Sequence, residues 1–353
     1  MRKYIKGIIV KYTSVMNKTI VVCEYLWIGG EGELRSKTRV FKTDEVCLEG
    51  NLVVPNWNYD GSSTKQAPSD GNTEVILKPH SIFADPFRKG EKSECYIVLC
   101  DTYEPGGKPL PTNHRYNADK LFNARVDEVP WFGLEQEYFL VLNSTDSVNR
   151  IPVPDGRHYC GQSTRVERII VEKHLHACLY AGLTISGINS EVSEDQWEFQ
   201  IGPCIGICAA DQLIVARYLL ERVAELYNAS INYYPKPSSL INGSGCHINF
   251  STASMRAPGG LKVIESCMPK LEKRHKEHIA VYGEHNELRL TGKHETSDMN
   301  KFSFGVGTRN TSVRIPTQTA KDGFGYFEDR RPASNIDPYK ATSIIFKTCC
   351  LCD

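Results

Sequence analysis

The sequence predicts an α+β fold, in which a strand-rich part precedes a larger part that mixes strands with helices. Up to about residue 107, short apolar runs such as 20–23 and 95–100 alternate with glycine-rich and polar turns, which is typical of β-strands. The glycine- and proline-rich run 104–109 indicates a linker. Because 353 residues exceed a usual single core, we expect two domains, 1–107 and 108–353.

Two helices are expected in the second part. One is predicted at about 165–180 and the other at 209–227, from apolar residues spaced by three or four positions. The side chains expected on one face of the second helix are Leu213, Ala216, Leu220, Val223 and Tyr227. Helices and acid-bearing strands therefore share this part.

The charge balance excludes some function classes. Forty-two basic and forty-two acidic residues give no net charge, so no overall field attracts nucleic acid or an anionic membrane. The thirteen cysteines are scattered, without the spacing of a disulfide framework or a zinc site. These features favour a soluble enzyme in a reducing compartment.

The N-terminal sequence favours a cytoplasmic location. Lys6 and Lys11 interrupt the apolar run 8–10, which is too short for a secretory core, and no segment approaches the length of a membrane span. The absence of acids before Glu24 leaves a transit peptide as an alternative.

The most informative segment is 131–142, which reads WFGLEQEYFLVL. On a β-strand, Glu135 and Glu137 point from the same face. Two like charges side by side on a half-buried strand are unfavourable unless cations hold them. The segment therefore indicates a metal-binding strand, the alternative being a solvent-facing strand with chance acids.

Further candidate ligands come from two later segments. In 189–203, alternation places Glu198 and Gln200 opposite three large apolar side chains, and Glu191 precedes a polar turn that could bring it beside Glu198. In 242–250, a glycine-containing loop precedes His247 and Asn249 at strand spacing. Several acids with one imidazole suit Mg²⁺ or Mn²⁺, which retain water and carry substrate phosphates.

Arginines gather near the C-terminus, in 308–316 and 325–332, among small residues and one further acid, Glu328. The planar guanidinium matches phosphate and carboxylate oxygens. Together with the acidic strands, these arginines would supply both halves of a phosphoryl-transfer site. The alternative is that they are solvated surface groups.

These segments together resemble the glutamine synthetases of the eukaryotic, shorter-subunit class. The resemblance runs from 28–30 and the loop NYDGSST at 58–64, through the segments above, to NIDPY at 335–339. It covers the chain except for roughly the first twenty residues.

The resemblance implies an N-terminal β-grasp domain and a catalytic domain in which antiparallel strands form a funnel, with flanking helices. It also implies a homo-oligomer of two stacked pentameric rings, in which the loop bearing Asp60 completes the neighbouring subunit's site. No nucleic acid or membrane partner is expected.

The resemblance further implies that ATP phosphorylates the γ-carboxylate of L-glutamate and that ammonia displaces the phosphate. Two divalent ions, Mg²⁺ or Mn²⁺, would assist. The ligands of one ion would be Glu137, Glu191 and Glu198, and those of the other Glu135, His247 and Glu328.

Other residues receive roles from the same resemblance. Arg309 and Arg314 would clamp the phosphates, Asp60 would deprotonate ammonium, and Glu295 would close the site against water. Glutamate and ammonium would be bound by Asn242, Gly243, His247, Arg289, Arg330, Tyr159 and Ser63. The nucleotide contacts would be Trp131, Pro203, Asn249, Ser251, Arg256, Arg314 and Tyr326.

The sequence departs from the family pattern at several places. Segment 162–168 differs and is about two residues shorter than usual, which bears on the ammonium pocket near Tyr159. Leu288, Thr308 and Thr317 replace usual arginine, asparagine and basic residues. No candidate metal ligand or catalytic acid is lost.

Three alternative functions remain open. A ligase that joins glutamate to a polyamine would share the ATP and metal residues, but the intact Asp60 loop suits ammonium better than a bulky amine. An inactive scaffold would be expected to lose ligands, and all six are present. A guanidino kinase would leave the Asp60 loop and Glu295 unexplained.

Overall fold

The computed structural model describes residues 19–43, 53–67, 71–88, 90, 93–143, 158–161, 166–238, 241–293 and 296–352. The chain divides into two compact units. The first comprises Met1–Asn113 with Tyr180–Gly182, and the second comprises His114–Leu179 with Leu183–Asp353.

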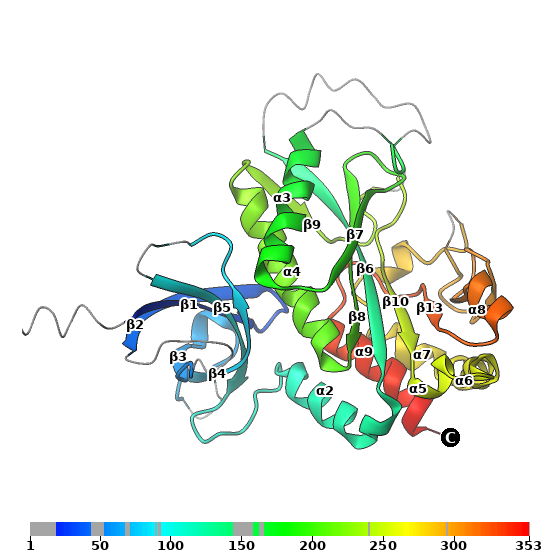
Figure 1. The fold of residues 1–353 in the computed structure, drawn as a ribbon, viewed down its shortest axis with the longest axis horizontal. Coiled ribbons are helices and arrows are strands. Elements are labelled where there is room, and N and C mark those ends of the chain that lie inside the picture. The colour runs from blue at the N-terminus through cyan, green and yellow to red at the C-terminus, as the bar shows by residue number, and fades with distance from the viewer. Residues whose placement is uncertain are drawn as a thin grey trace, which may run out of the picture. The chain divides into compact units, whose positions relative to one another are not determined.

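The first unit is built on a five-stranded mixed sheet (Figure 1). Its strands are β1 (Thr19–Ile28), β2 (Leu34–Thr43), β3 (Trp57–Asp60), β4 (Glu74–Ala84) and β5 (Ser93–Tyr103). The spatial order is β2-β1-β5-β4-β3, in which β1 and β5 run parallel and the other neighbours antiparallel. A short 3₁₀ turn, η1 (Ser62–Thr64), follows β3.

Alternation along β1 supplies one side of the first unit's core. Val21, Cys23, Tyr25 and Trp27 are all buried and share one face of the strand. They form a single cluster with side chains of β4 and β5, namely Leu77, Val98 and Cys100. This face of the sheet is thus packed by every second residue.

The run 104–109, whose composition indicates a linker, forms a closed turn. The amide of Glu104 donates to the carbonyl of Lys108 at 2.8 Å, and that of Gly107 donates to the carbonyl of Glu104 at 2.8 Å. Gly107 has a φ of +86°, which its lack of a Cβ permits. A bridge between Tyr103 and Pro109 closes the turn within the first unit.

The second unit contains an eight-stranded sheet, and its combination with helices confirms the α+β prediction. Its strands are β6 (Trp131–Leu142), β7 (Ile185–Ser190), β8 (Gln196–Ile205), β9 (Ala229–Asn232), β10 (Cys246–Ser251), β11 (Phe304–Val306), β12 (Val313–Ile315) and β13 (Phe327–Asp329). The order is β11-β12-β13-β10-β6-β8-β7, and β9 also pairs with β6. The pairing is antiparallel except between β11 and β12.

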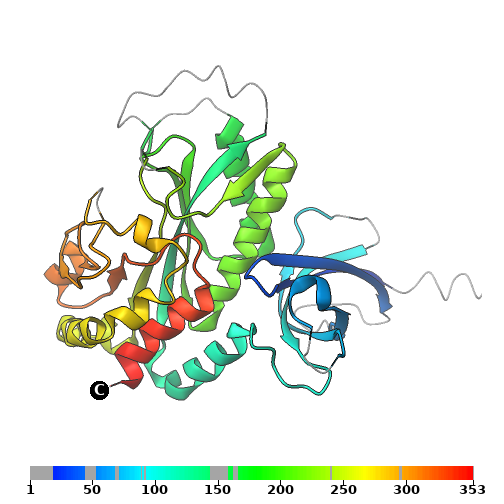
Figure 2. The ribbon, with the colours of Figure 1, turned by 180° about the vertical axis from the view of Figure 1, so that it is seen from behind.

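Helices flank this sheet (Figures 1 and 2). They are α2 (His114–Phe122), α3 (Val166–Ala181), α4 (Ile207–Glu225), α5 (Ala253–Arg256), α6 (Gly260–Lys273), α7 (His275–Ile279), α8 (Thr317–Asp322) and α9 (Pro338–Phe346). Shorter segments are the 3₁₀ turns η2 (Asn123–Glu128) and η4 (Asn286–Leu288) and the π-helical η5 (Lys347–Leu351). Within the part of the chain that the structure describes, no helix combines the length and apolar character that a membrane span requires.

Both predicted helices exist, but the second differs from its expected pattern. Helix α4 ends at Glu225, so Tyr227 lies beyond it, and every residue from 209 to 220 is buried. It packs against β8 and β9 and against α9. The predicted apolar face is buried at Leu213, Ala216, Leu220 and Val223, and only Tyr227 falls outside the helix. Polar side chains on the other faces of α4 are buried too, because they are paired: Arg115 forms two hydrogen bonds with Asp211.

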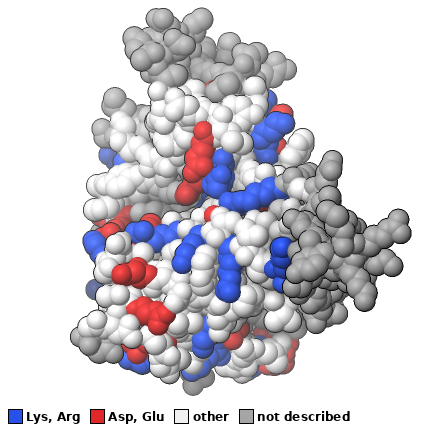
Figure 3. Space-filling view, turned by 90° about the vertical axis from the view of Figure 1, so that its left-hand side faces the viewer, with Lys and Arg blue, Asp and Glu red and all other residues white. Residues whose placement is uncertain are grey.

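Charges of both signs occur on the face of the molecule in Figure 3, as the balanced composition predicts. The twelve cysteines that the structure describes are all free thiols.

Candidate active site

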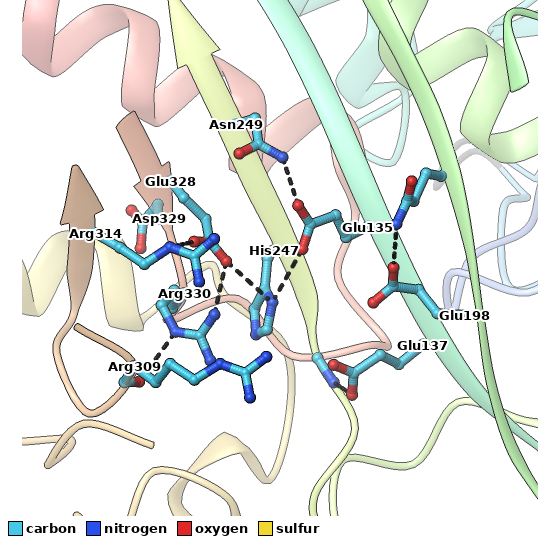
Figure 4. A network of polar contacts seen from close by, with 12 residues as sticks. Glu135, Glu137, Glu198, His247, Asn249, Arg309, Arg314, Glu328, Asp329 and Arg330 are labelled. Atoms are coloured by element: carbon cyan, nitrogen blue, oxygen red, sulfur yellow. Dashed lines mark hydrogen bonds and ion pairs between the residues drawn. The ribbon is translucent and has the colours of Figure 1, made fainter. Parts of the chain in front are cut away.

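The register of four neighbouring strands brings the predicted acids together. Across β6 and β10, Glu135 lies opposite His247. Across β6 and β8, Glu137 lies opposite Glu198. Across β10 and β13, Glu328 lies opposite Asn249, so side chains distant in sequence meet on one face of the sheet (Figure 4).

One group consists of Glu135, His247 and Glu328, which can each direct one ligand atom to within 4.8 Å of the others. Nδ1 of His247 lies 3.5 Å from a carboxylate oxygen of Glu135 and 3.5 Å from one of Glu328. Asn249 donates from Nδ2 to Glu135 Oε1 at 2.7 Å and so fixes that carboxylate. Two carboxylates and an imidazole form a suitable donor set for a divalent cation.

The second group consists of Glu137, Glu191 and Glu198, also within 4.8 Å of one another. The polar turn after β7 does fold Glu191 back: its amide donates to the carbonyl of Gln196 at 2.9 Å. The two groups are adjacent, because Glu135 and Glu137 are separated by a single residue of β6. An all-carboxylate set is typical of hard cations such as Mg²⁺ and Mn²⁺.

Burial and mutual repulsion oppose charge on these acids. Burial raises the pKa of Glu198 to about 9, and the neighbouring Glu135 and Glu137 add to this rise. Burial and the charge of Glu191 raise the pKa of Glu137 to about 8. Such carboxylates ionise more easily when a cation offsets their charge, so the crowding fits a bound metal.

His247 is held in the form that ligates metals. Burial, and then the charge of Arg330, keep the pKa of its imidazole well below the usual range. The ring is therefore neutral at pH 7, as metal coordination requires. Arg289, which is buried, places Nη2 2.9 Å from His247 Nε2 and 3.0 Å from the carbonyl of Arg330.

Arginines line the opposite side of the site. Arg330 Nη1 lies 2.7 Å from Glu328 Oε1, and Arg314 Nε lies 2.8 Å from Glu328 Oε2. Arg330 also donates from Nε to the carbonyl of Arg309 at 3.1 Å. In Figure 4 the guanidinium groups of Arg314 and Arg330 lie beside Glu328, and that of Arg309 lies next to Arg330. Positive groups thus face the acid clusters, as transfer of an anionic phosphoryl group requires.

A polar cavity of about 220 Å³ joins these groups. Both candidate metal groups open into it, as do Arg309, Arg314 and Arg330. Among the residues predicted to bind substrate, those lining it are Tyr159, Asn242, Gly243, His247, Arg289 and Arg330. A Cβ at position 245 would lie 2.5 Å from Arg289 Nη2, so a larger residue there would displace this guanidinium.

A second, apolar cavity of about 470 Å³ lies next to the first, and Glu135 and Gln200 line both. The predicted nucleotide contacts that line it are Trp131, Pro203, Asn249, Ser251, Arg256 and Tyr326. The guanidinium of Arg256 lies 4.0 Å from the ring centroid of Trp131, a cation–π contact that fixes one wall. An apolar slot that leads to a charged site suits a ligand with a flat ring and an anionic tail.

Three further predicted site residues, Asp60, Ser63 and Glu295, are not among the residues that line these two cavities. Asp60 and Ser63 lie in the first unit, and both are exposed. Asp60 Oδ1 accepts hydrogen bonds from the amide and the hydroxyl of Ser62, at 2.9 and 2.6 Å, which hold the pKa of Asp60 below its usual value. Glu295 lies outside the described residues.

Two glutamines of the site received no predicted role. Gln196 donates from Nε2 to Glu137 Oε2 at 3.1 Å and to the carbonyl of Gly243 at 2.9 Å. Gln200 donates from Nε2 to Glu198 Oε1 at 2.6 Å. Both lie an even number of residues from Glu198 on β8, so their side chains point to the same face of the strand. This spacing was the signal that could have identified them.

A buried network behind β13 was also missed. Arg331 donates from Nε and Nη2 to the two carboxylate oxygens of Asp329, at 2.9 and 2.6 Å, and both side chains are fully buried. The hydroxyl of Tyr282 donates to Asp329 at 2.7 Å. Asp329 and Arg331 alternate along the chain with Glu328 and Arg330. Side chains at the end of β13 therefore point to the candidate active site on one face and to this buried network on the other.

Comparison with known proteins adds independent findings. Residues 118–259 match the family model described as "Glutamine synthetase, catalytic domain". The chain is 52% identical over 339 residues to glutamine synthetase N-1 of Phaseolus vulgaris and, over the same length, to glutamine synthetase cytosolic isozyme 1-2 of Oryza sativa subsp. japonica, with 93% of each chain covered. It is 49% identical over 351 residues to the glutamine synthetase of Candida glabrata, covering 97% of this chain and 92% of that protein. With identities of this size over nearly its whole length, the chain belongs to the glutamine synthetase family.

Proposed function

We propose that this protein joins ammonia to the γ-carboxylate of L-glutamate in an ATP-dependent reaction that passes through γ-glutamyl phosphate. The products are L-glutamine, ADP and phosphate. The observation that carries the proposal is the pairing of two candidate metal groups with an arginine-lined polar cavity, beside an apolar cavity. Family membership makes the protein a glutamate–ammonia ligase.

Two divalent cations, Mg²⁺ or Mn²⁺, would be held by the two acidic groups. Glu137, Glu191 and Glu198 would hold one, and Glu135, His247 and Glu328 the other. When bound, such ions neutralise the charge on the transferring phosphoryl oxygens. Asn249, Gln196 and Gln200 orient three of these carboxylates through their amide groups, in the way that outer-shell hydrogen bonds orient ligands.

The apolar cavity would hold the adenine ring and ribose of ATP. Its base-facing wall would include Trp131, Pro203 and Tyr326, and Arg256 would keep Trp131 in place. Since Glu135 lines both cavities, the nucleotide phosphates would lie toward the polar cavity. Arg309 and Arg314 would then bind the phosphoryl oxygens.

Glutamate would occupy the polar cavity. Arg289 and Arg330 would bind its carboxylates, and Asn242 and Gly243 its amino-acid end. Arg289 is a guanidinium already anchored by backbone carbonyls, so it would bind a carboxylate without being ordered first. The γ-carboxylate would point at the arginine-lined side, where phosphorylation gives it a leaving group.

Ammonium would enter beside Tyr159 and Ser63, and Asp60 would remove its proton. The low pKa of the Asp60 carboxyl, set by Ser62, keeps it charged and attractive to ammonium at neutral pH. Glu295 would close the site and limit hydrolysis of the acyl phosphate.

The two compact units would correspond to an N-terminal domain, 1–107, and a catalytic domain, 108–353. We further propose a cytoplasmic homo-oligomer of two stacked pentameric rings, in which Asp60 serves the site of a neighbouring subunit. Support for the location comes from rice relatives whose names describe them as cytosolic isozymes.

A coupled assay tests the reaction. Purified full-length protein is supplied with glutamate, ATP and Mg²⁺, and phosphate release and product are measured with ammonia, hydroxylamine or putrescine as nucleophile. We expect turnover with the first two and little with putrescine, and none after chelation of the metal. Absence of glutamine formation would overturn the proposal, while faster turnover with putrescine would identify an amine ligase.

A further inference from the structure

Two cysteines lie together where β8 passes into α4. Cys204 is buried near the end of β8, and Cys208 is exposed in the first turn of α4, four residues later. Their thiols are within hydrogen-bonding reach of each other. Gln212, one turn along the helix, donates from Nε2 to Cys208 Sγ at 3.1 Å. The proposed ligation uses neither thiol.

The surroundings divide the two thiols into distinct roles. The hydrogen bonds from Cys204 and Gln212 lower the pKa of Cys208 to about 6, although burial acts in the opposite direction. The first turn of a 19-residue helix also favours an anion at this place. Donation to Cys208 and burial raise the pKa of Cys204. The shifts thus favour the thiolate at Cys208 and the protonated thiol at Cys204, the usual arrangement of an attacking and a resolving cysteine.

The turn that joins the two cysteines is also part of the wall of the apolar cavity. Pro203, directly before Cys204, lines that cavity. Gly206, between the cysteines, has a φ of +53° and donates from its amide to the carbonyl of Pro130 at 2.9 Å. Pro130 in turn precedes Trp131, which lines the same cavity. A change in the conformation of this turn would therefore affect the cavity wall at Pro203 and, through Pro130, at Trp131.

We propose that Cys204 and Cys208 form a reversible disulfide under hydroperoxide, and that the disulfide weakens nucleotide binding in the adjacent apolar cavity. This inference rests on the proposed function, because it takes the cavity to be the nucleotide site. A disulfide requires the sulfurs to approach to about 2 Å. The approach draws the first turn of α4 toward β8, and the movement displaces Pro203 and strains the link between Gly206 and Pro130.

The chemistry balances with a hydroperoxide as the oxidant. The Cys208 thiolate attacks the O–O bond, forming an S–O bond while water or an alcohol leaves, which gives a sulfenic acid. The Cys204 thiol then loses its proton and attacks that sulfur, so that an S–S bond forms, the S–O bond breaks and water leaves. Two thiols are oxidised and one hydroperoxide is reduced, and a dithiol reverses the change.

The test uses the full-length protein before and after treatment with stoichiometric hydrogen peroxide. Alkylation followed by peptide mass spectrometry identifies the disulfide, and calorimetric titration with ADP and Mg²⁺ measures binding. We expect a peptide pair containing Cys204 and Cys208, a loss of ADP affinity of about tenfold or more, equal to about 1.4 kcal/mol, and recovery with dithiothreitol. The Cys208→Ser variant should bind ADP normally and resist peroxide.

The controls distinguish failure of the proposed disulfide from failure of the proposed nucleotide site. Cys160→Ser removes the other exposed cysteine of the described residues and should leave the peroxide response intact. A disulfide that never forms, unchanged ADP affinity after it forms, or an equal loss in Cys208→Ser would each overturn the inference. Absence of ADP binding by the reduced protein would overturn the proposed nucleotide site, and with it this inference.

Discussion

At the scale of single residues, the site is organised around carboxylates that the fold forces together. Glu137 and Glu198 are direct cross-strand neighbours, a placement that repulsion opposes, and burial raises the pKa of both. Amide groups from Gln196 and Gln200 hold the two carboxylates in place despite this cost. Such an arrangement is stable when a cation is shared between the acids.

Glu328→Gln should reduce activity by more than about 100-fold at ordinary metal concentrations. Even residues outside a metal's own ligands cost 10–100-fold when they are removed, and this change removes a charged ligand atom. Metal titration of activity, with circular dichroism to confirm folding, checks the result. Glu225→Gln, at the exposed end of α4, serves as a control and should be near normal; full activity of Glu328→Gln would exclude Glu328 as a ligand.

Asp60→Ala should impair the ammonia-dependent step far more than formation of the acyl phosphate. The carboxylate stabilises and deprotonates ammonium, whereas hydroxylamine is already neutral at pH 7 and attacks without that help. Turnover with hydroxylamine should therefore be partly retained. The comparison is the ratio of the two rates in Asp60→Ala and in the unaltered protein, and an unchanged ratio would remove Asp60 from this role.

At the scale of elements, strand parity explains which parts of the site the sequence could predict. The sequence predicts that Glu135 and Glu137 share one face of a strand, because side-chain direction in a strand repeats every second residue. The pairing of β10 with both β6 and β13 could not be read, since register between distant segments depends on long-range packing. For the same reason α4 was expected to have one apolar face, whereas tertiary contacts bury it on nearly all sides.

The buried pair on β13 yields a prediction about stability. Arg331→Met should lower the free energy of unfolding by about 3–5 kcal/mol, because it leaves Asp329 buried without its cation. The double variant Asp329→Leu/Arg331→Met removes both charges and should lose clearly less. Urea unfolding measures both, and Arg222→Met, whose ion pair with Glu225 is partly exposed, should lose less than about 1 kcal/mol. Equal losses in the single and double variants would contradict the argument.

Helix α3 carries a histidine that makes stability depend on pH. Burial lowers the pKa of His174 to about 4, and its Nε2 lies 2.9 Å from the carbonyl of Ala216 on α4. The ring is neutral when folded and takes up a proton on unfolding below about pH 6.5, so its contribution is complete above that pH and is lost as the pH falls toward 4. We expect a loss of roughly 2 kcal/mol between pH 7 and 5.

The His174→Gln variant isolates this effect, since its side chain does not titrate. Urea unfolding followed by tryptophan fluorescence, at pH 7, 6 and 5, should give a shallower fall in stability for the variant than for the unaltered protein. Parallel curves would show that His174 is not the group responsible.

At the scale of the whole molecule, the predicted roles are divided between the two compact units. All six candidate metal ligands lie in the second unit, whereas Asp60 lies in the first. If Asp60 serves a neighbouring subunit, activity requires assembly, and a variant held as a monomer should be inactive. The sequence could predict this division only through family resemblance, because no residue pattern specifies which copy of a loop reaches which site.

Mixing two inactive variants tests the shared site. Asp60→Ala and Glu328→Ala chains, dissociated and reassembled together in equal amounts, should recover about a quarter of normal activity if pairing is random and sites are independent. Sizing must confirm the mixed assembly, and each variant reassembled alone is the control. No recovery in confirmed mixed assemblies would place Asp60 and the metals in the same subunit's site.

Strand β6 contributes to both cavities. Its residues 131–135 line the apolar cavity, and Glu135 and Glu137 line the polar one. The length of the strand therefore sets the distance between Trp131 and Glu137 at roughly 20 Å, from a rise of about 3.3 Å per residue. Losing or gaining a single codon within it would turn every later side chain to the opposite face. A change of two residues keeps the acids directed at the site and alters the distance between the two cavities by about 6.6 Å. A change of one residue does so only with a β-bulge, such as the register shift between β6 and β8 at Phe132–Leu134.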